Sequence, residues 1–300
     1  MEENHNKYYE KIKDLLLDNK VYKATKDYSK NRSDIMTYYQ VGKELYEAGK
    51  SYGENIVKKF SKDLYNDTGL KYSPTSLRYM RLFYAFFEKC QPVVDISWSH
   101  YTILLPLKDI NKINYYIGQI TAYNLSKRQL KEKIKSEEYE RLDKKTREKL
   151  INKEEKYEIT DYIKHPIVIK SKKAIPDKIS EKFLKNIILE NIDEFLLELG
   201  PGFTYVTNEY KIDAYDVYNY IDILLFNIEY NCYVVVELKV TDLKKEHIGQ
   251  IQIYMNYINK NLRKITQDKT IGIIICKKEI GYVIEYASDP RIIATSYILQ

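Results

Sequence analysis

Two apolar segments with a short polar tip between them constrain the fold of this chain more than any other feature. Residues 220–227 read YIDILLFN and residues 232–238 read CYVVVEL, with IEYN between them. Apolar residues, many of them β-branched, run almost without interruption through both segments, which is typical of strands buried on both faces of a sheet. Each segment nevertheless carries one acid, Asp222 and Glu237. The sequence therefore predicts a hairpin in which two carboxylates need a compensating partner.

The spacing of the hairpin predicts where these acids lie. If the turn is centred between Glu229 and Tyr230, Asp222 stands directly opposite Glu237, with Cβ atoms about 4.5–5.5 Å apart. Strand alternation puts Lys239 on the same face. Like charges this close repel strongly unless a cation lies between them, and Mg²⁺ binds through one or two carboxylates plus water and phosphate oxygens. The pattern indicates a divalent-metal site; the alternative is an exposed strand whose charged side chains face solvent.

Further strand-like and helical segments surround this hairpin. Helices are expected over 175–199, which Gly200-Pro201-Gly202 ends, and over 244–262. The other strand-like runs are FTYVTNEYKI at 203–212, IGIIIC at 271–276 and YVIEYA at 282–287. The order helix, three strands, helix, strand predicts an α/β domain with a mixed sheet flanked by helices, which we assign to residues 171–300.

The first half predicts an all-helical domain, residues 1–150. A helix is expected from Ser33 and Asp34 to a C-terminal Gly49. Residues 51–87 contain a helix stopped at Asp67-Thr68-Gly69 and a second helix that begins at Ser73-Pro74, in a helix-turn-helix-like arrangement. The nearly continuous charge of residues 131–156 indicates a solvated connecting helix, and residues 151–170 are expected to form a linker.

Charge is divided unequally within the net +6: residues 1–150 hold 29 basic and 21 acidic residues, and residues 151–300 hold 20 and 22. A basic half with interleaved Tyr and Phe suits a phosphate-backbone partner. Arg78 and Arg81 lie three apart on one expected helix, and Lys127 and Arg128 begin another, so these four residues are candidate DNA contacts. The alternative is a lysine-rich solvated face in which the helices only pack against each other.

Several classes of protein are disfavoured. No apolar run reaches the roughly 18 residues of a membrane span, and the first residues lack the positive start of a signal peptide. The three cysteines, Cys90, Cys232 and Cys276, lie far apart and are expected to be buried thiols. Neither a zinc-hydrolase histidine pair nor a phosphate-binding glycine loop occurs. We expect a soluble, cytoplasmic protein without a membrane partner.

Residues in both halves resemble one known family. The order Glu198, Asp222, Glu237-x-Lys239, Gln250-x-x-x-Tyr254 resembles the PD-(D/E)XK nucleases, and in particular the bacterial YhcG type. The second-half phrases that carry the resemblance are FLLELGPGF, IDILLF, YVVVELK, HIGQIQIYMNY, TIGIIIC and VIEYA. In the first half, YYQVGKELYE, YGENIVKKFSKDL, SPTSLRYMRLFY and SWSHYTILL resemble the helical domain that accompanies this nuclease. Ile221 stands where the superfamily has Pro, Leu125 where the YhcG type usually has Trp, and residues 166–175 diverge.

The resemblance implies a restriction-endonuclease-like core that hydrolyses phosphodiester bonds in DNA with Mg²⁺ or Mn²⁺. It implies metal ligation by Asp222, Glu237, the Leu238 carbonyl and Glu198. It also implies that Lys239 is the catalytic lysine, and that Gln250 and Tyr254, four apart on one helix face, orient the water, the lysine or the scissile phosphate.

Other readings stay open. The chain could bind or scaffold DNA without cleaving it, or its helical half could bind protein. Because cutting both strands of a duplex needs two active centres or two visits, we expect a homodimer.

Overall fold

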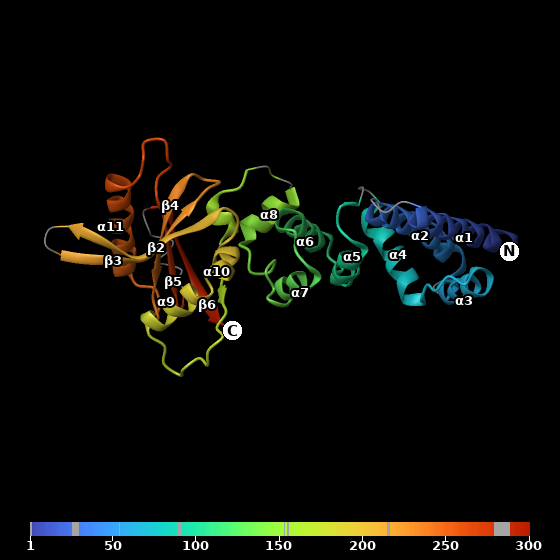
Figure 1. The fold of residues 1–300 in the computed structure, drawn as a ribbon, viewed down its shortest axis with the longest axis horizontal. Helices are drawn as coiled ribbons and strands as arrows, with labels where there is room; N and C mark the ends of the chain where they lie inside the picture. The colour runs from blue at the N-terminus through green and yellow to red at the C-terminus, as the bar shows by residue number, and fades with distance from the viewer. Residues whose placement is uncertain are drawn as a thin grey trace. The chain divides into compact units, whose positions relative to one another are not determined.

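The computed structural model describes residues 2–25, 30–53, 55–88, 92–152, 154, 156–214, 217–278 and 289–300. The chain divides into two compact units, Met1–Lys135 and Ser136–Gln300. In Figure 1 the first unit runs from blue to green and the second from green to red. The boundary lies earlier in the chain than the expected end of the helical domain at residue 150.

The first unit is helical in all its described regular structure, as expected. Its elements are α1 (Glu2–Thr25), α2 (Lys30–Tyr52), α3 (Ile56–Thr68), α4 (Pro74–Phe87), α5 (Trp98–Leu104), the 3₁₀ helix η1 (Leu105–Leu107), α6 (Ile110–Tyr123) and α7 (Lys127–Lys135). The first four helices share a buried core that includes Leu16, Leu45, Phe60 and Leu77. Helices α2 and α4 approach closely at Gly42, where an added Cβ would lie 2.1 Å from the Met80 carbonyl oxygen.

Two helix ends follow the predicted local chemistry, but both predicted ends of α2 are wrong, since the helix begins at Lys30 and not at Ser33 or Asp34. Gly69 adopts φ 69° and ends α3, and the Ser73 side chain accepts a hydrogen bond in the first turn of α4, both as predicted. The predicted end of α2 at Gly49 is wrong, because the helix continues to Tyr52 and the left-handed residue is Gly53, with φ 72°. Glycine adopts this conformation without the steric penalty that a Cβ brings.

The second unit is an α/β fold built on a mixed sheet. Its elements are α8 (Lys144–Asn152), the 3₁₀ helix η2 (Ile159–Tyr162), β1 (Ile167–Ile169), α9 (Glu181–Glu190), α10 (Ile192–Leu199), β2 (Phe203–Ala214), β3 (Val217–Asn227), β4 (Cys232–Leu238), α11 (Lys245–Asn261), β5 (Ile271–Cys276) and β6 (Ile292–Leu299). The described residues form six strands in the order β1-β6-β5-β4-β3-β2. Neighbours among β2, β3 and β4 are antiparallel, and the remaining pairs are parallel. The expected mixed sheet with flanking helices is confirmed.

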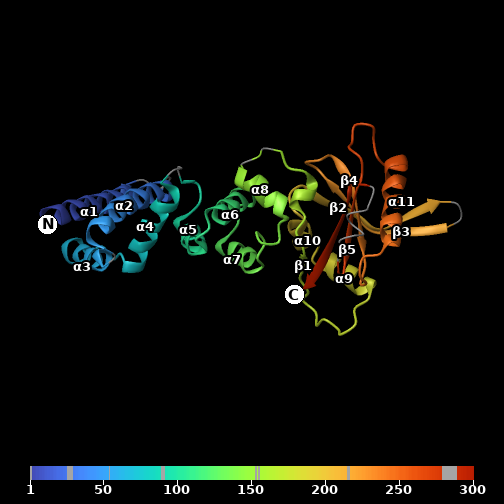
Figure 2. The same cartoon turned by 180° about the vertical axis from the view of Figure 1, so that it is seen from behind.

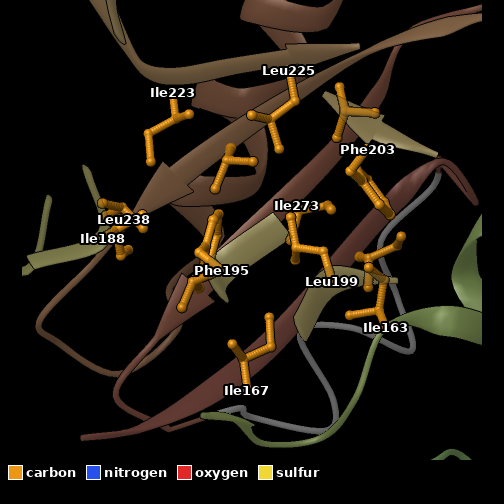
Figure 3. Close-up of a cluster of buried hydrophobic side chains, with 14 of the residues drawn as sticks. Ile163, Ile167, Ile188, Phe195, Leu199, Phe203, Ile223, Leu225, Leu238 and Ile273 are labelled. Carbon is orange, nitrogen blue, oxygen red and sulfur yellow. The ribbon is translucent and has the colours of Figure 1, made fainter. Parts of the chain in front are cut away.

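The sheet is covered by apolar side chains on both faces. One cluster joins Ile223, Leu225 and Ile273 of the sheet to Phe195 and Leu199 of α10, and Figure 3 shows these side chains gathered together. A second cluster joins other sheet residues to the buried side of α11. Figures 1 and 2 show α11 on one side of the sheet and α9 with α10 on the other. This two-sided cover explains the almost unbroken apolar runs in β3, β4 and β5.

Some expected elements differ. The single helix expected over 175–199 is two helices that meet at Asn191, whose side chain donates to the Ile187 carbonyl oxygen at 3.2 Å. Strands β1 and β6 were not expected; they pair in parallel at the edge of the sheet. Cys232 and Cys276 are buried, as predicted. The run YVIEYA and Cys90 lie outside the described residues.

Residues 136–170 belong to the second unit and contribute buried charges to it. Arg141 forms an ion pair with Glu198 of α10 and donates to the Pro166 carbonyl oxygen at 2.7 Å. Lys164 and Glu138 are 3.6 Å apart, with side chains 4% and 2% exposed. The expectation of a solvated connector is therefore wrong for this part of the charged run. None of the described helices is both long enough and apolar enough to cross a membrane.

Candidate active site

The β3–β4 hairpin brings the two predicted carboxylates together. Ile223 pairs with Val236, and the register continues to Asn227 opposite Cys232. This is the register that the sequence predicted, and it sets Asp222 opposite Glu237, one position beyond the Ile223–Val236 pair. Antiparallel neighbours of this kind share one face of the sheet.

Two N–H donors hold the Asp222 carboxylate. Its Oδ2 accepts from the Leu238 backbone N–H at 3.0 Å, which fixes the side chain across the gap between the strands. Its Oδ1 accepts from Lys185 of α9 at 3.3 Å. Asp222 is half-buried, so part of the site remains open to solvent.

Glu237 is the most confined acid of the site. Its side chain is 3% exposed, and its Oε1 accepts from Lys239 Nζ at 2.8 Å. Oε2 is buried and has no hydrogen-bond partner among the described residues. Burial first, and the charge of Asp222 second, raise the pKa of the Glu237 carboxyl to about 7, although Lys239 lowers it.

Lys239 is held as a charged ammonium. Burial by itself lowers the pKa of Lys239, but the hydrogen bond and charge of Glu237, with Glu181 and Asp222, raise it on balance. Glu181, in the first turn of α9, lies 4.0 Å from its Nζ. The backbone N–H of Lys239 donates to the Ile275 carbonyl oxygen at 2.8 Å, which anchors the end of β4 to β5.

Gln250 and Tyr254 of α11 form a linked pair, as their four-residue spacing predicted. The Gln250 amide donates to the Tyr254 hydroxyl at 2.7 Å. Tyr254 is buried, and burial raises its pKa, with smaller contributions from the charges of Glu237 and Asp222. Tyr254 also belongs to the apolar cluster that packs α11 against the sheet.

The donor set fits a hard divalent cation. Two carboxylates face one region, one of them is almost fully buried, and its second oxygen is orphaned. A buried anionic oxygen without a donor is unfavourable unless a positive charge meets it. Asp222 and Glu237 could therefore hold Mg²⁺ or a similar ion, with water and substrate oxygens as the other ligands.

Comparisons with known proteins identify family models that match both parts of the chain. Residues 160–300 match the YhcG PDDEXK nuclease domain, and residues 16–141 match the DUF1016 N-terminal domain. The chain belongs to the YhcG-type nucleases. Its hairpin, buried glutamate and following lysine all lie inside the matched nuclease domain.

Similar proteins include one from Escherichia coli (strain K12) with the name "Putative nuclease YhcG", which is 24% identical over 311 residues, 88% of this chain and 83% of that protein. A solved repair endonuclease from Pyrococcus abyssi is 18% identical with a TM-score of 0.29, over 41% of this chain and 49% of that one. A structure of EndoMS with double-stranded DNA is 18% identical with a TM-score of 0.29, over 43% and 48%. The chain spans about half the length of these two solved proteins.

Glu198, the acid that the YhcG resemblance added to the metal site, has other partners. Both of its oxygens accept from Arg141, and Oε1 also accepts from the Val168 backbone N–H at 2.9 Å. Across the described residues, no group of three or more His, Cys, Asp or Glu side chains could hold a metal ion. The structure thus brings together Asp222 and Glu237, and it holds Glu198 in a buried ion pair.

The other predicted residues of this YhcG-type chain stay predictions. Leu238 brings its backbone N–H to Asp222, and metal ligation by its carbonyl is untested. In the helical unit, Arg78 of α4 is exposed and Arg81 is half-buried. Lys127 and Arg128 are exposed on α7, where Arg128 pairs with Glu132 at 3.1 Å.

Sequence reasoning missed three charged residues of the site, namely Glu181, Lys185 and Glu209. Glu181 and Lys185 are four apart on α9, a spacing that puts both on one side of a helix. Glu209 of β2 contacts the same Lys185 ammonium at 2.9 Å. The helical spacing was a usable signal, but nothing local indicated that the middle of α9 lies beside Asp222.

Proposed function

We propose that this YhcG-type chain is a metal-dependent endonuclease that hydrolyses phosphodiester bonds in DNA at Asp222, Glu237 and Lys239. The observation that carries the proposal is the orphaned, buried Oε2 of Glu237 beside a second carboxylate. A site that only stabilised the fold would have no need of an unpaired buried oxygen.

Each residue of the site has a separate role in this proposal. Asp222, Glu237 and the Leu238 carbonyl would hold Mg²⁺ or Mn²⁺, which when bound supplies Lewis-acid stabilisation of phosphate oxygens. Lys239, an ammonium 2.8 Å from Glu237, offsets negative charge that develops on the phosphate during attack by water. Gln250 and Tyr254, joined at 2.7 Å, orient the water or the phosphate.

DNA is the proposed substrate because the positive charge of the helical half is complementary to the phosphate backbone. The basic surplus belongs to residues 1–150, where Arg78, Arg81, Lys127 and Arg128 are candidate backbone contacts. The nuclease half has no such surplus, so binding affinity would come mainly from the helical unit. We expect that unit to hold the duplex and the sheet to carry the chemistry.

Cleavage of plasmid, branched and single-stranded DNA tests the proposal. With Mg²⁺ or Mn²⁺ we expect cleavage by the wild type, none in EDTA, and a loss of about 10²–10³-fold in Asp222→Asn and Lys239→Met. Asp242→Asn and Lys277→Met are matched controls, because these exposed residues lie close in sequence to the ends of β4 and β5. Cleavage that persists in EDTA, or in both site variants, would contradict the mechanism.

A second candidate, DNA binding without cleavage, is favoured by one observation. The Lys185 ammonium already contacts Asp222, so a fixed cation satisfies one of the two acids. On this reading every variant, and the wild type, would bind DNA and leave it intact with either metal. The same cleavage assay, run beside a gel-shift assay, decides between the two candidates.

A further inference from the structure

Lys185 is shared between two acids on neighbouring strands. Its Nζ lies 2.9 Å from Glu209 Oε1 on β2 and 3.3 Å from Asp222 Oδ1 on β3. The lysine side chain is 14% exposed and that of Asp222 is 17% exposed, whereas that of Glu209 is 60% exposed. The ammonium therefore bridges a confined carboxylate and a solvated one.

The sheet register puts Glu209 in line with the site. Its neighbours Asn208 and Tyr210 pair with Ile223 and Ile221, so Glu209 stands opposite Asp222. Its φ of 51° is a left-handed conformation, which is rare for a residue with a Cβ. Glu209, Asp222 and Glu237 thus follow one another across β2, β3 and β4, and Lys185 contacts the first two.

We propose that Lys185 is a displaceable counter-cation that competes with a divalent ion for Asp222. This inference rests on the metal site of the proposed function and adds a residue that sets its affinity. A divalent ion and the Lys185 ammonium compete for Asp222, because like charges repel and Asp222 Oδ2 already accepts a hydrogen bond from Leu238.

Glu209 allows Lys185 to leave Asp222 without becoming a buried ammonium that lacks an acceptor. The contact to Glu209 is the shorter of the two, and it persists if the contact to Asp222 is lost. A buried lysine without an acceptor would be unfavourable. Lys185 therefore orients the Asp222 side chain before metal entry, and after metal entry it contacts Glu209 alone.

The proposal predicts opposite effects on metal affinity for substitutions at Lys185 and at Glu209. Removing the lysine charge should tighten metal binding, because the ion no longer competes. Removing the Glu209 charge should weaken metal binding, because the lysine then has only Asp222 as a partner. The effect of Glu209 should disappear once Lys185 is absent, which a double-mutant cycle measures directly.

Calorimetric titration of the full chain with MnCl₂, without DNA, tests the proposal. We expect Lys185→Met to lower the Kd by about tenfold or more, which corresponds to about 1.4 kcal/mol. Glu209→Gln should raise the Kd several-fold alone and leave it unchanged in the Lys185→Met background. Lys185→Arg keeps the charge and should bind like the wild type. Lys182→Met is the matched control, since Lys182 is exposed on the same helix and should leave the Kd unchanged.

The outcomes separate this inference from the metal site itself. If Asp222→Asn abolishes Mn²⁺ binding while Lys185→Met binds no tighter than the wild type, the metal site stands and the role of Lys185 is refuted. If Asp222→Asn binds like the wild type, the proposed function fails as well. Lys185→Gln serves as a second neutral variant should Lys185→Met not show the wild-type circular dichroism spectrum, and equal Kd values for Lys185→Gln and the wild type refute the role.

Discussion

Glu237→Gln should stabilise the metal-free nuclease unit at alkaline pH. The buried Glu237 carboxyl has its pKa raised from 4.5 to about 7, first by burial and then by Asp222. Gln keeps the shape of the side chain, and its Oε1 can still accept from Lys239, but it carries no charge to bury. The substitution therefore removes the penalty of ionisation and little else.

The sign and size of the effect follow from proton linkage. Because the folded-state pKa lies above the unfolded value of 4.5, the folded unit binds the proton more tightly, and stability falls as pH rises through 7. Between pH 5 and pH 8 the wild type should lose about 2–3 kcal/mol relative to Glu237→Gln. For a unit of this size, that corresponds to a difference of roughly 5–10 °C in Tm at pH 8.

Hydrogen exchange in increasing urea, with EDTA present, is a suitable assay. Peptides from β3 and β4 report on the second unit separately from the helical unit, so a single transition need not describe the whole chain. Glu246→Gln is the control, because Glu246 is an exposed carboxylate on α11. In excess Mg²⁺ the wild type should be more stable than Glu237→Gln, since only the wild type retains both carboxylates.

Two results would refute this reasoning. A difference between wild type and Glu237→Gln that does not change from pH 5 to pH 8 would mean that Glu237 does not titrate in this range. A wild type that is more stable than the variant at pH 8 in EDTA would mean that its charge is already compensated within the protein. Either result would remove the physical reason to expect a cation at Oε2.

Three other predictions concern the rest of the chain. Arg141→Met should destabilise the second unit by about 3–5 kcal/mol in urea unfolding, because the Glu198 carboxylate then has only the Val168 N–H as a donor. The double variant Arg141→Met/Glu198→Gln should recover part of this loss of stability. Glu198→Gln should leave the Mn²⁺ Kd unchanged in calorimetry, and a large loss of affinity would return Glu198 to the metal site. Arg78→Gln/Arg81→Gln should reduce the slope of log affinity for DNA against log salt by about 2 in fluorescence anisotropy; an unchanged slope would assign α4 to packing alone.

The hairpin was predictable because its determinants are local. A short tip of four residues between two apolar runs set the turn, and the turn set the register that joins Asp222 to Glu237. The caps at Gly69 and Ser73 were predictable for the same reason, since each depends on one residue and the adjacent turn. Gly49 shows the limit of such reasoning: a glycine can lie inside a helix because a neighbouring side chain needs the space, here that of Arg81.

The remaining parts of the site depend on contacts between distant residues. Glu198 was assigned to the metal site by resemblance, but its carboxylate is taken by Arg141, which is 57 residues away in the chain. Lys185 and Glu209 lie beside Asp222 only because α9 packs against the sheet and β2 pairs with β3. Strand β1, with three residues, is defined by its pairing with β6 and not by its own sequence.

The arrangement of charges explains why the metal-free site keeps a carboxylate oxygen that destabilises the fold. Asp222 is neutralised by Lys185 and by a backbone N–H, and Glu237 is neutralised at Oε1 by Lys239. Each acid thus keeps one internal cation, and the uncompensated position is Glu237 Oε2. An internal amine at that oxygen would stabilise the metal-free fold but would also close the site. Instead, Glu237 Oε2 stays without a donor, and Lys185 has Glu209 as a second partner. The first feature favours binding of a divalent ion, and the second allows that ion to exchange.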